Sequence, residues 1–521
     1  MKNITLLEAK VGILAVSCLS ITALFACVDK DARSDLNPNL PTDQAQNGDF
    51  GDQGGGSEQG LNFPVFDDGV LAFPGAEGYG KNVTGARAGE GREIYHVTNL
   101  NDAGPGSFRD AVSKPWRIIV FDVSGVIKLS SNPIVLKSNQ TILGHTAPGD
   151  GIVLYNGRVS ASGAQNLIVR YLRIRMGAAY PSELDACGIA NGANMIFDHC
   201  SMTWGKDECF SINPDGKGTA PKNITIQNSI IGQGLQNHSC GGLMQTDISN
   251  GCTIFRNLYI DNKTRNPKVK GLNQFVNNVV YNWGSGAAYN MSGDSQGKSE
   301  TTIENNYFIV GPCHNWQNVA QPDGSIKTEY VPMNPARPFT GGNGNFNTYC
   351  KGNYYDNNKD GALDGVEITE TNWSQYCSGS PVFLEARSDL HPIIRSQKSA
   401  QEAYEWVVEK VGAYLPVRDE VDKYLMDELI SLGRKGTIIQ DERKAEQFPL
   451  GGPGTINAAQ KPLDSDNDGM PDAFEDAWGL DKYDSTDAVK EAKNGYLNIE
   501  NYALSLEYPD EYEYELNKNK Q

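Results

Sequence analysis

The chain repeats one short pattern six times between residues 165 and 306. Each unit is a run of β-branched or aromatic residues that ends at a polar position, and the unit starts lie 21 to 29 residues apart. A unit this short cannot bury its own apolar face, so successive units must stack on one another as the coils of a solenoid. The six units begin at Gln165, Ala193, Lys222, Gly251, Leu272 and Glu300.

The segments between these runs show no helical periodicity, which predicts an all-β solenoid. Glycine, with 56 of 521 residues, also favours a turn-rich β structure. An antiparallel β-sandwich with coincidental spacing is the alternative. Four units end in asparagine, and we expect these side chains to form a hydrogen-bonded ladder along one turn of the solenoid: Asn228, Asn257, Asn278 and Asn306.

Two segments after the repeats, residues 400–414 and 419–432, carry apolar residues at helical spacing. We expect two helices there that cover one end of the solenoid, because solenoid ends need capping. The solenoid with this helical cap would span residues 63–453, and the acidic residues 454–521 would form a separate module.

The N-terminus has the features of an export signal. Basic residues Lys2 and Lys10 precede an apolar run, and Cys27 follows it, so residues 1–26 predict a lipoprotein signal peptide with a lipid on Cys27. An ordinary cleaved signal is the alternative. The polar residues 27–62 predict a flexible tether, and the acidic ones directly after Cys27 resemble the surface-export tag of some Gram-negative lipoproteins. We therefore expect the protein on the extracellular face of the outer membrane, or else secreted or periplasmic.

The formal net charge of −19 argues against nucleic acid or an anionic membrane surface as the main partner. An acidic protein can still bind a polyanion through a local cationic groove or through bridging metal ions. We expect a monomer.

Exported chains can form disulfides, and eight cysteines follow Cys27. Cys200 and Cys252 lie in strand-like runs and are predicted to be buried thiols. The loop-like cysteines are expected to form disulfides, although the spacing fixes no pairing: Cys313, Cys350 and Cys377.

Several ordered motifs between about residues 71 and 449 resemble those of family 1 polysaccharide lyases, the pectate lyases. This resemblance implies a right-handed, single-stranded parallel β-helix and an enzyme that cleaves polygalacturonate, the pectin backbone, to unsaturated oligogalacturonides. The motifs are Ala-Phe-Pro-Gly-Ala-Glu-Gly-Tyr-Gly at 72–80, Tyr-His-Val-Thr-Asn-Leu-Asn-Asp-Ala-Gly-Pro-Gly-Ser-Phe-Arg at 95–109, Ile-Ile-Val-Phe-Asp-Val-Ser-Gly-Val-Ile at 118–127, Asp-His-Cys-Ser at 198–201 with Trp204, and Arg-Asn-Pro-Lys-Val-Lys at 265–270.

A pectate lyase must neutralise the substrate carboxylate, remove the proton from C5 and release the oxygen on C4. Calcium bound by protein carboxylates meets the first need. By resemblance, Asp185 and Asp207 match two calcium-binding positions of the family. The third match falls near Ser211, which is not a carboxylate, and Glu208 is the expected substitute. Turn capping or simple solvation is the alternative for each carboxylate.

Arg265 matches the arginine to which the family's proton abstraction is attributed. The alternative is that Arg265 only pairs with substrate or with an aspartate. Lys270 matches a position that binds a substrate carboxylate, and Lys268 would point the same way along an extended strand. A lysine that relatives carry on the preceding coil is missing, and His238 is its only stand-in.

A second calcium pattern lies near the C-terminus, with Gly469 at its sharp turn. It is typical of EF-hand-like or dockerin-like structural calcium loops. Acidic residues occupy positions 1, 3, 5, 9 and 12 of the loop: Asp464, Asp466, Asp468, Asp472 and Glu475. The segment from Asp356 to Glu367 fits the same pattern but follows a strand, so calcium and an Asx-rich turn both stay open.

Two other functions compete with the lyase. A polygalacturonase-type hydrolase would need carboxylates on both sides of the scissile bond, and Asp185, Asp198 and Asp207 are the available ones. The chain lacks the Asn-Thr-Asp and Gly-His-Gly motifs associated with those enzymes, and we expect Asp198 to support its coil instead. The other alternative is a non-catalytic, pectin-binding solenoid.

Overall fold

A computed structural model describes residues 60–61, 63, 69–130, 132–284, 288–291, 297–333 and 337–518, all within one compact unit, Gly51–Gln521. The predicted signal peptide, Cys27 and almost all of the predicted tether lie outside the described residues. None of the helices in the described ranges has both the length and the apolar character needed to span a bilayer.

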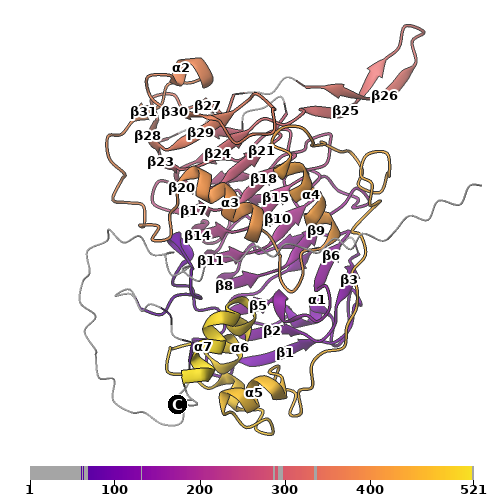
Figure 1. Cartoon of the computed structure of the whole chain (residues 1–521), viewed down its shortest axis with the longest axis vertical. Helices are drawn as coiled ribbons and strands as arrows, with labels where there is room; N and C mark the ends of the chain where they lie inside the picture. Colours follow the sequence, from indigo (N-terminus) through magenta and orange to yellow (C-terminus); the bar gives the residue numbers. More distant parts are fainter. Residues whose placement is uncertain are drawn as a thin grey trace, which may run out of the picture. The chain divides into compact units, whose positions relative to one another are not determined.

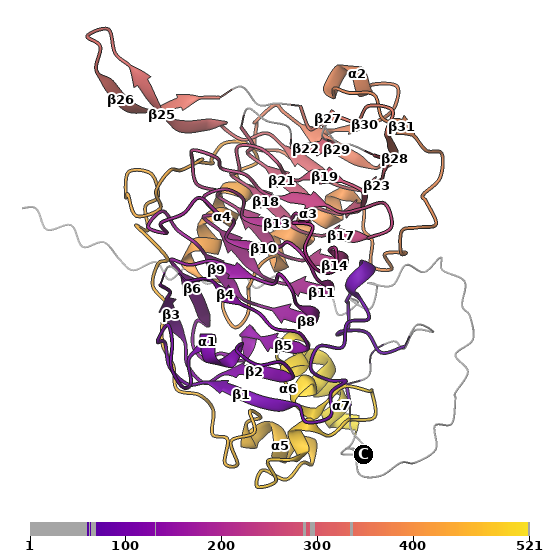
Figure 2. The same cartoon turned by 180° about the vertical axis from the view of Figure 1, so that it is seen from behind.

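Three long sheets form the body of the molecule (Figures 1 and 2). The chain visits them in turn, so that each coil adds one strand to each sheet. The eleven-stranded sheet contains, in spatial order, β1 (Glu93–Val97), β2 (Arg117–Phe121), β5 (Gln140–Leu143), β8 (Gln165–Arg170), β11 (Ala193–Asp198), β14 (Lys222–Gln227), β17 (Cys252–Phe255), β20 (Leu272–Val276), β23 (Ser299–Glu304), β28 (Phe346–Lys351) and β31 (Val382–Phe383).

The other two long sheets follow the same coil order. The ten-stranded sheet contains β3 (Gly125–Lys128), β6 (Ile152–Tyr155), β9 (Arg173–Arg175), β12 (Ser201–Thr203), β15 (Ile230–Gly232), β18 (Leu258–Ile260), β21 (Val279–Tyr281), β24 (Tyr307–Ile309), β29 (Asn353–Asp356) and β30 (Val366–Ile368). The eight-stranded sheet contains β4 (Ile134–Val135), β7 (Val159–Ser160), β10 (Cys187–Ile189), β13 (Phe210–Ile212), β16 (Leu243–Gln245), β19 (Lys268–Lys270), β22 (Tyr289–Met291) and β27 (Phe339–Gly341).

Neighbouring strands in these sheets run parallel, apart from the antiparallel pair β29 and β30. Parallel strands joined coil by coil make a right-handed parallel β-helix, which confirms the predicted fold class. A separate antiparallel hairpin, β25 (His314–Ala320) and β26 (Ile326–Pro332), projects from the last coils (Figure 2).

The predicted asparagine ladder is present, with one change of register. Asn257 donates to Asn278 (3.1 Å), Asn278 to Asn306 (3.1 Å) and Asn306 to Asn353 (2.8 Å). The prediction for Asn228 is wrong, because β14 pairs with β17 one residue out of step with the sequence alignment. Ser229 therefore occupies the ladder position and donates its backbone N–H to Asn257 (2.9 Å).

All eight cysteines among the described residues are free thiols. Cys200 and Cys252 are buried, as predicted, whereas the disulfides expected among the loop-like cysteines do not form.

Two helices match the predicted segments, α3 (Ala400–Lys410) and α4 (Glu420–Ile430). Ser399 and Glu402 form a capping box at the start of α3, which stabilises that end. Both helices pack on the outer face of the ten-stranded sheet, against residues such as Ile230 and Tyr307 (Figure 1). The expectation that they cover an end of the solenoid is therefore wrong, because the apolar outer face of β15 to β24 needs its own cover.

The acidic tail also docks on the β-helix. It contains α5 (Asp472–Trp478), the 3-10 turn η3 (Asp487–Val489), α6 (Asn498–Glu507) and α7 (Pro509–Lys518). Short helical segments elsewhere lie in loops: η1 (Gly78–Gly80), α1 (Phe108–Ala111), η2 (Gly144–Thr146) and α2 (Trp373–Tyr376).

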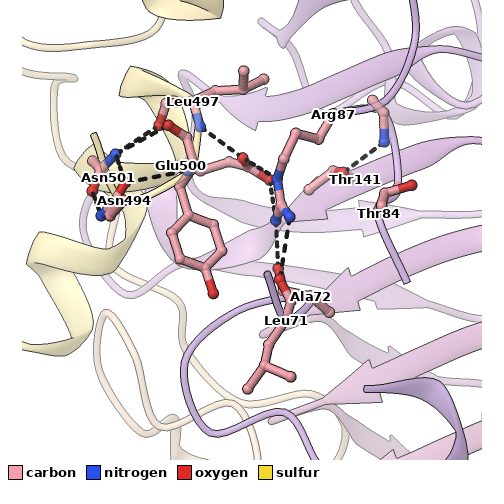
Figure 3. A network of polar contacts seen from close by, with 12 residues as sticks. Leu71, Ala72, Thr84, Arg87, Thr141, Asn494, Leu497, Glu500 and Asn501 are labelled. Carbon is pink, nitrogen blue, oxygen red and sulfur yellow. Dashed lines mark hydrogen bonds and ion pairs between the residues drawn. The ribbon is translucent and has the colours of Figure 1, made fainter. Parts of the chain in front are cut away.

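Apolar tail residues pack on the outer face of the first coils of the eleven-stranded sheet, where Ile118, Val120 and Ile168 are buried. Arg87 joins the segment before the first coil to the tail: it donates to both carboxylate oxygens of Glu500 (2.7 and 3.0 Å; Figure 3). The tail is thus part of the same compact unit and covers the first coils.

The junction between β18 and α4 contains two buried carboxyl groups, Asp261 and Glu428, which share a hydrogen bond. Burial raises the pKa of Asp261 to about 6, and burial together with the charge of Asp261 raises the pKa of Glu428 well above its ordinary value. Each group keeps one oxygen that no donor of the described residues reaches, so the pair must hold a proton between them.

We expect Glu428→Gln to stabilise the protein at neutral and alkaline pH. A carboxyl group whose pKa is raised by folding stabilises the protein below its unfolded pKa, and that contribution is lost as the pH rises through the folded pKa. The amide introduced at this position would donate to an ionised Asp261, so the variant should gain about 2 kcal/mol over the wild type at pH 8 and little at pH 4. Thermal unfolding of both proteins at the two pH values tests this expectation, and equal pH dependence would contradict it.

Candidate active site

Strands β10 and β13 are neighbours in the eight-stranded sheet (Figure 2). Three carboxylates gather where these two strands begin. Cys187 of β10 pairs with Phe210 of β13, and Asp185 and Glu208 each lie two residues before these partners. Stacking of the coils therefore brings Asp185 beside Glu208, and Asp207 precedes Glu208 in the same loop. Ligand oxygens of the three residues all lie within 4.8 Å of one another.

Arg265 reaches this cluster from the loop before β19. Its Nη1 forms an ion pair with Oε1 of Glu208. The Glu208 side chain is only 3% exposed, whereas that of Arg265 is 26% exposed, so the guanidinium lies at the boundary between the cluster and solvent.

Two glycines hold the backbone of Arg265. The Gly242 N–H donates to the carbonyl oxygen of Arg265 (2.7 Å), and a Cβ added to Gly241 would lie 2.6 Å from that same oxygen. Only glycine permits this approach at residue 241, and it sets the position of Arg265 above the preceding coil.

Burial and charge repulsion dominate the electrostatics of the cluster. Burial, together with the hydrogen bond and the charge of Asp185, raises the pKa of Glu208 to about 9. The pKa of Asp185 is also raised, mainly by burial. Burial acts to lower the pKa of Arg265, but Cys240 and Glu208 outweigh it and raise that pKa above its ordinary value. In this arrangement, Arg265 stays protonated.

The donor set suits a hard cation. Three carboxylates without nitrogen or sulfur ligands are typical of calcium sites, and a divalent cation would relieve the repulsion that raises the pKa of Glu208. Ser211, where the family pattern has a third carboxylate, instead accepts a hydrogen bond from the backbone N–H of Leu243 (3.1 Å). Asp185, Asp207 and Glu208 are therefore the residues that fit such an ion.

Basic residues lie beside the carboxylates and on β19. Nδ1 of His238 lies 2.8 Å from Oδ1 of Asp207. Lys268 and Lys270 flank buried Val269 on β19, so both point outward, as alternation along a strand predicts. Within the described part of the chain, the ammonium group of Lys270 makes no ion pair.

Arg158 is a site residue that sequence reasoning missed. Its Nη2 lies 3.7 Å from Oδ2 of Asp185. Arg158 directly precedes β7, on the coil before β10. The sequence repeats mark the eleven-stranded sheet only, so they carry no signal for a residue on the eight-stranded sheet one coil away.

Asp198 lies apart from this cluster, in agreement with a supporting role. It is fully buried and accepts hydrogen bonds from Arg170 (2.8 Å), Gln227 (2.9 Å) and Asn228 (2.8 Å). These bonds use its oxygens within the wall of the β-helix.

The C-terminal acidic loop also brings carboxylates together, but with a different set from the predicted one. Asp464, Asp466 and Asp468 form one group, and Asp468 also groups with Glu475 and Asp487. Asp472 is in neither group, and its two oxygens accept hydrogen bonds from the backbone N–H (2.7 Å) and the hydroxyl (2.8 Å) of Ser465.

The loop from Asp356 to Glu367 connects the antiparallel strands β29 and β30. Its polar side chains bond mainly within the loop: Asn358 donates to Asp364 (2.8 Å), and Asp360 accepts from the backbone N–H of Ala362 (2.8 Å). These contacts are those of an Asx-rich turn.

Comparison with known proteins identifies the family. A family model described as pectate lyase matches residues 74–354. A probable pectate lyase C of Aspergillus fumigatus is 48% identical over 437 residues, which cover 84% of this chain and 94% of the relative. That of Aspergillus flavus is 47% identical over 448 residues, covering 86% and 96%. The chain belongs to the pectate lyase family.

Solved structures give weaker likenesses to this chain. The cedar pollen allergen jun a 1 aligns with 16% identity and a TM-score of 0.43, covering 64% of this chain and 92% of the allergen. A thermostable pectate lyase aligns with 14% identity and a TM-score of 0.43, covering 65% and 97%. The sequence matches, which extend over most of both chains, identify the protein as a polysaccharide lyase.

Proposed function

We propose that this protein is a calcium-dependent pectate lyase that cleaves polygalacturonate by β-elimination and releases unsaturated oligogalacturonides. Family membership supports the reaction class. The observation that supports the mechanism is the position of Arg265 beside the cluster of Asp185, Asp207 and Glu208. A base and a cation-binding group thus lie side by side, as the elimination requires.

The cluster of Asp185, Asp207 and Glu208 is the proposed catalytic calcium site. Calcium bound there would neutralise the uronate carboxylate and make the neighbouring C5 proton more acidic. The chain carries a formal net charge of −19, so without local positive charge it would repel a polyuronate.

Arg265 is the proposed base. It takes the proton from C5, the C5–H electrons form a double bond between C4 and C5, and the C4–O bond breaks with its electrons on oxygen. That oxygen then takes a proton from solvent. Before this step Arg265 must leave Glu208 and release one proton to solvent, because the guanidinium is protonated when it pairs with Glu208.

Lys270, Lys268 and His238 are the proposed contacts to substrate carboxylates, and Arg158 joins them on geometric grounds. Lysine offers a point charge without the bidentate fork of arginine. We therefore expect the lysine contacts to hold the polyuronate along the sheet without fixing the orientation of each carboxylate. His238 is 47% exposed and lies next to Asp207, which suits contact with a sugar beside the cation site.

Incubation with polygalacturonate and calcium tests the proposal. We expect ultraviolet-absorbing unsaturated ends to form, and chelation to abolish their formation. New reducing ends without absorbance would instead mean a hydrolase, and binding without either product would mean a non-catalytic pectin-binding protein. The burial of Asp198 in the coil wall weighs against the hydrolase, because it removes one of the three carboxylates that the hydrolase would recruit.

The proposal includes a lipid on Cys27 that anchors a monomeric enzyme to the outer membrane, facing polymeric substrate. The signal-like residues 1–26 and the tether-like residues 27–62 support it. Mass spectrometry of the mature N-terminus should find acylated Cys27, and an unmodified N-terminus at another residue would contradict the anchor.

A further inference from the structure

The acidic loop near the C-terminus recruits a residue from outside its own sequence motif. Asp487 lies in the 3-10 turn η3, beyond α5, and its ligand oxygen falls within 4.8 Å of those of Asp468 and Glu475. Asp466 and Asp464 approach Asp468 from the loop, within the same distance of one another. Carboxylates from three separate places in the chain therefore converge.

The oxygens of Asp464 accept from the backbone N–H groups of Asp468 and Gly469 (3.2 Å each), whereas oxygens of the other four carboxylates are buried and have no hydrogen-bond partner among the described residues. Glu475 is 0% exposed, Asp468 3% and Asp487 4%. Both oxygens of Glu475 and of Asp466, and one oxygen each of Asp468 and Asp487, lack a donor. Buried ionised carboxylates without partners are strongly unfavourable, so this arrangement calls for a cation.

The remaining oxygens fix the shape of the loop. Oδ1 of Asp468 accepts from the backbone N–H of Met470 (2.9 Å), and Oδ2 of Asp487 accepts from that of Asp481 (3.1 Å). Each of these carboxylates is thus held by one oxygen and presents the other inward. Burial and the neighbouring acidic charges raise the pKa of Asp468 to about 7 and that of Glu475 to about 8, as expected for anions crowded without a counter-ion.

We propose that Asp464, Asp466, Asp468, Glu475 and Asp487 bind a calcium ion, with Asp487 in the place that the motif assigns to Asp472, and that this ion fastens the tail to the first coils of the β-helix. Oxygen ligands from a flexible loop, several of them charged, favour Ca²⁺ over Mg²⁺, which demands stricter geometry.

The position of the loop supports the fastening role. Met470 is fully buried in the cluster that contains Ile118 and Val120 of β2. A Cβ added to Gly469 would lie 3.3 Å from Val120 and 3.3 Å from Ile499 of α6, so the loop is held between the sheet and the tail helix. Charge repulsion within the loop would weaken this docking, and a bound cation would relieve it.

The test is thermal unfolding of the full chain in chelator, in 1 mM calcium or in 1 mM magnesium (roughly a hundredfold excess over a typical Kd for such loops). Every protein carries Asp207→Asn, so that calcium at the proposed catalytic site contributes little. Calcium should raise Tm by about 5 °C, and magnesium by much less.

Glu475→Gln and Asp487→Asn should each lose most of the calcium-induced rise. Their Tm in chelator should equal or exceed that of the parent, because each removes a buried, unpaired charge. Asp476→Asn is the matched control: Asp476 follows Glu475 on α5 but is exposed and pairs with Lys482 (2.8 Å), so the control should keep the full rise.

The proposal is overturned if the parent shows no calcium-induced rise, if Glu475→Gln or Asp487→Asn keeps it, or if Asp472→Asn loses more of it than Asp487→Asn does. Should a variant unfold without a clear transition, calcium titration calorimetry on the folded protein at 25 °C replaces Tm, and the loss of one bound ion per chain is then the expected result. The outcome does not depend on lyase activity, so failure here is separable from failure of the proposed function.

Discussion

Arg265→Lys is expected to lower kcat on polygalacturonate about 1000-fold, the range for loss of a positioned general base. Lysine retains the charge and can still pair with Glu208, so the folded site and its charge balance should persist. A shorter, compact ammonium cannot reach the position of the guanidinium, and the C5 proton then lacks an acceptor. Formation of unsaturated ends, followed by ultraviolet absorbance, measures the loss.

Two measurements separate this effect from damage to the site. Tm and the calcium concentration for half-maximal residual activity should stay near their wild-type values in Arg265→Lys. Retention of more than a tenth of wild-type kcat would mean that Arg265 only binds substrate or pairs with Glu208. Lys268→Met is the companion variant, since we expect it to raise KM with little change in kcat.

Asp207→Asn is expected to raise the calcium concentration needed for half-maximal activity at least about 100-fold, since even outer-shell changes cost 10- to 100-fold in metal affinity. The variant removes one charge from the cluster of three but keeps an oxygen ligand. High calcium should therefore restore part of the activity, whereas chelator should abolish it in both proteins. Calcium titration of the initial rate is the measurement.

Asp215→Asn is the matched control, because Asp215 lies on the same coil but is exposed. It accepts from the backbone N–H of Lys217 (2.9 Å) and from the side chain of Asn191 (3.2 Å), both outside the cluster. Its calcium dependence should equal that of the wild type. An Asp207→Asn enzyme with unchanged calcium dependence would move the metal away from the cluster of Asp185, Asp207 and Glu208.

The β-helix could be predicted because residues at equivalent positions of the sequence repeat also lie at equivalent positions of successive coils. Three ladder residues occupy equivalent positions both in the sequence repeat and in the stacked coils: Asn257, Asn278 and Asn306. Asn228 did not, because β14 pairs with β17 one residue away from the sequence alignment. The observed register places Ile224 and Ile226 beside Cys252 and Ile254 and moves the ladder position to Ser229.

The candidate site was predictable only in part, for a related reason. Asp185 and Glu208 could be expected together, since they begin equivalent strands of neighbouring coils. Arg158 could not, because the sequence repeats mark only the eleven-stranded sheet and Arg158 precedes a strand of the eight-stranded one. Asp487 could not, because it lies outside the loop motif and reaches the acidic loop only through the fold of the tail. Helix periodicity likewise predicted α3 and α4, but which apolar face they cover depends on the whole solenoid.

Because the tail docks on the first coils, the outer face of those coils is covered only after the tail has been synthesised. Ile118, Val120 and Ile168 are covered by residues as late as Ala503 and Leu504. Arg170, deep in the wall of the early coils, finds Glu507 as a partner (2.7 Å) only when α6 arrives. A ribosome makes those residues after all the coils, so until α6 is made the nascent β-helix must carry an exposed apolar stripe and a guanidinium with only one of its two carboxylate partners, Asp198. Premature termination anywhere before α6 would leave an exposed apolar surface that favours aggregation, as well as a shorter chain.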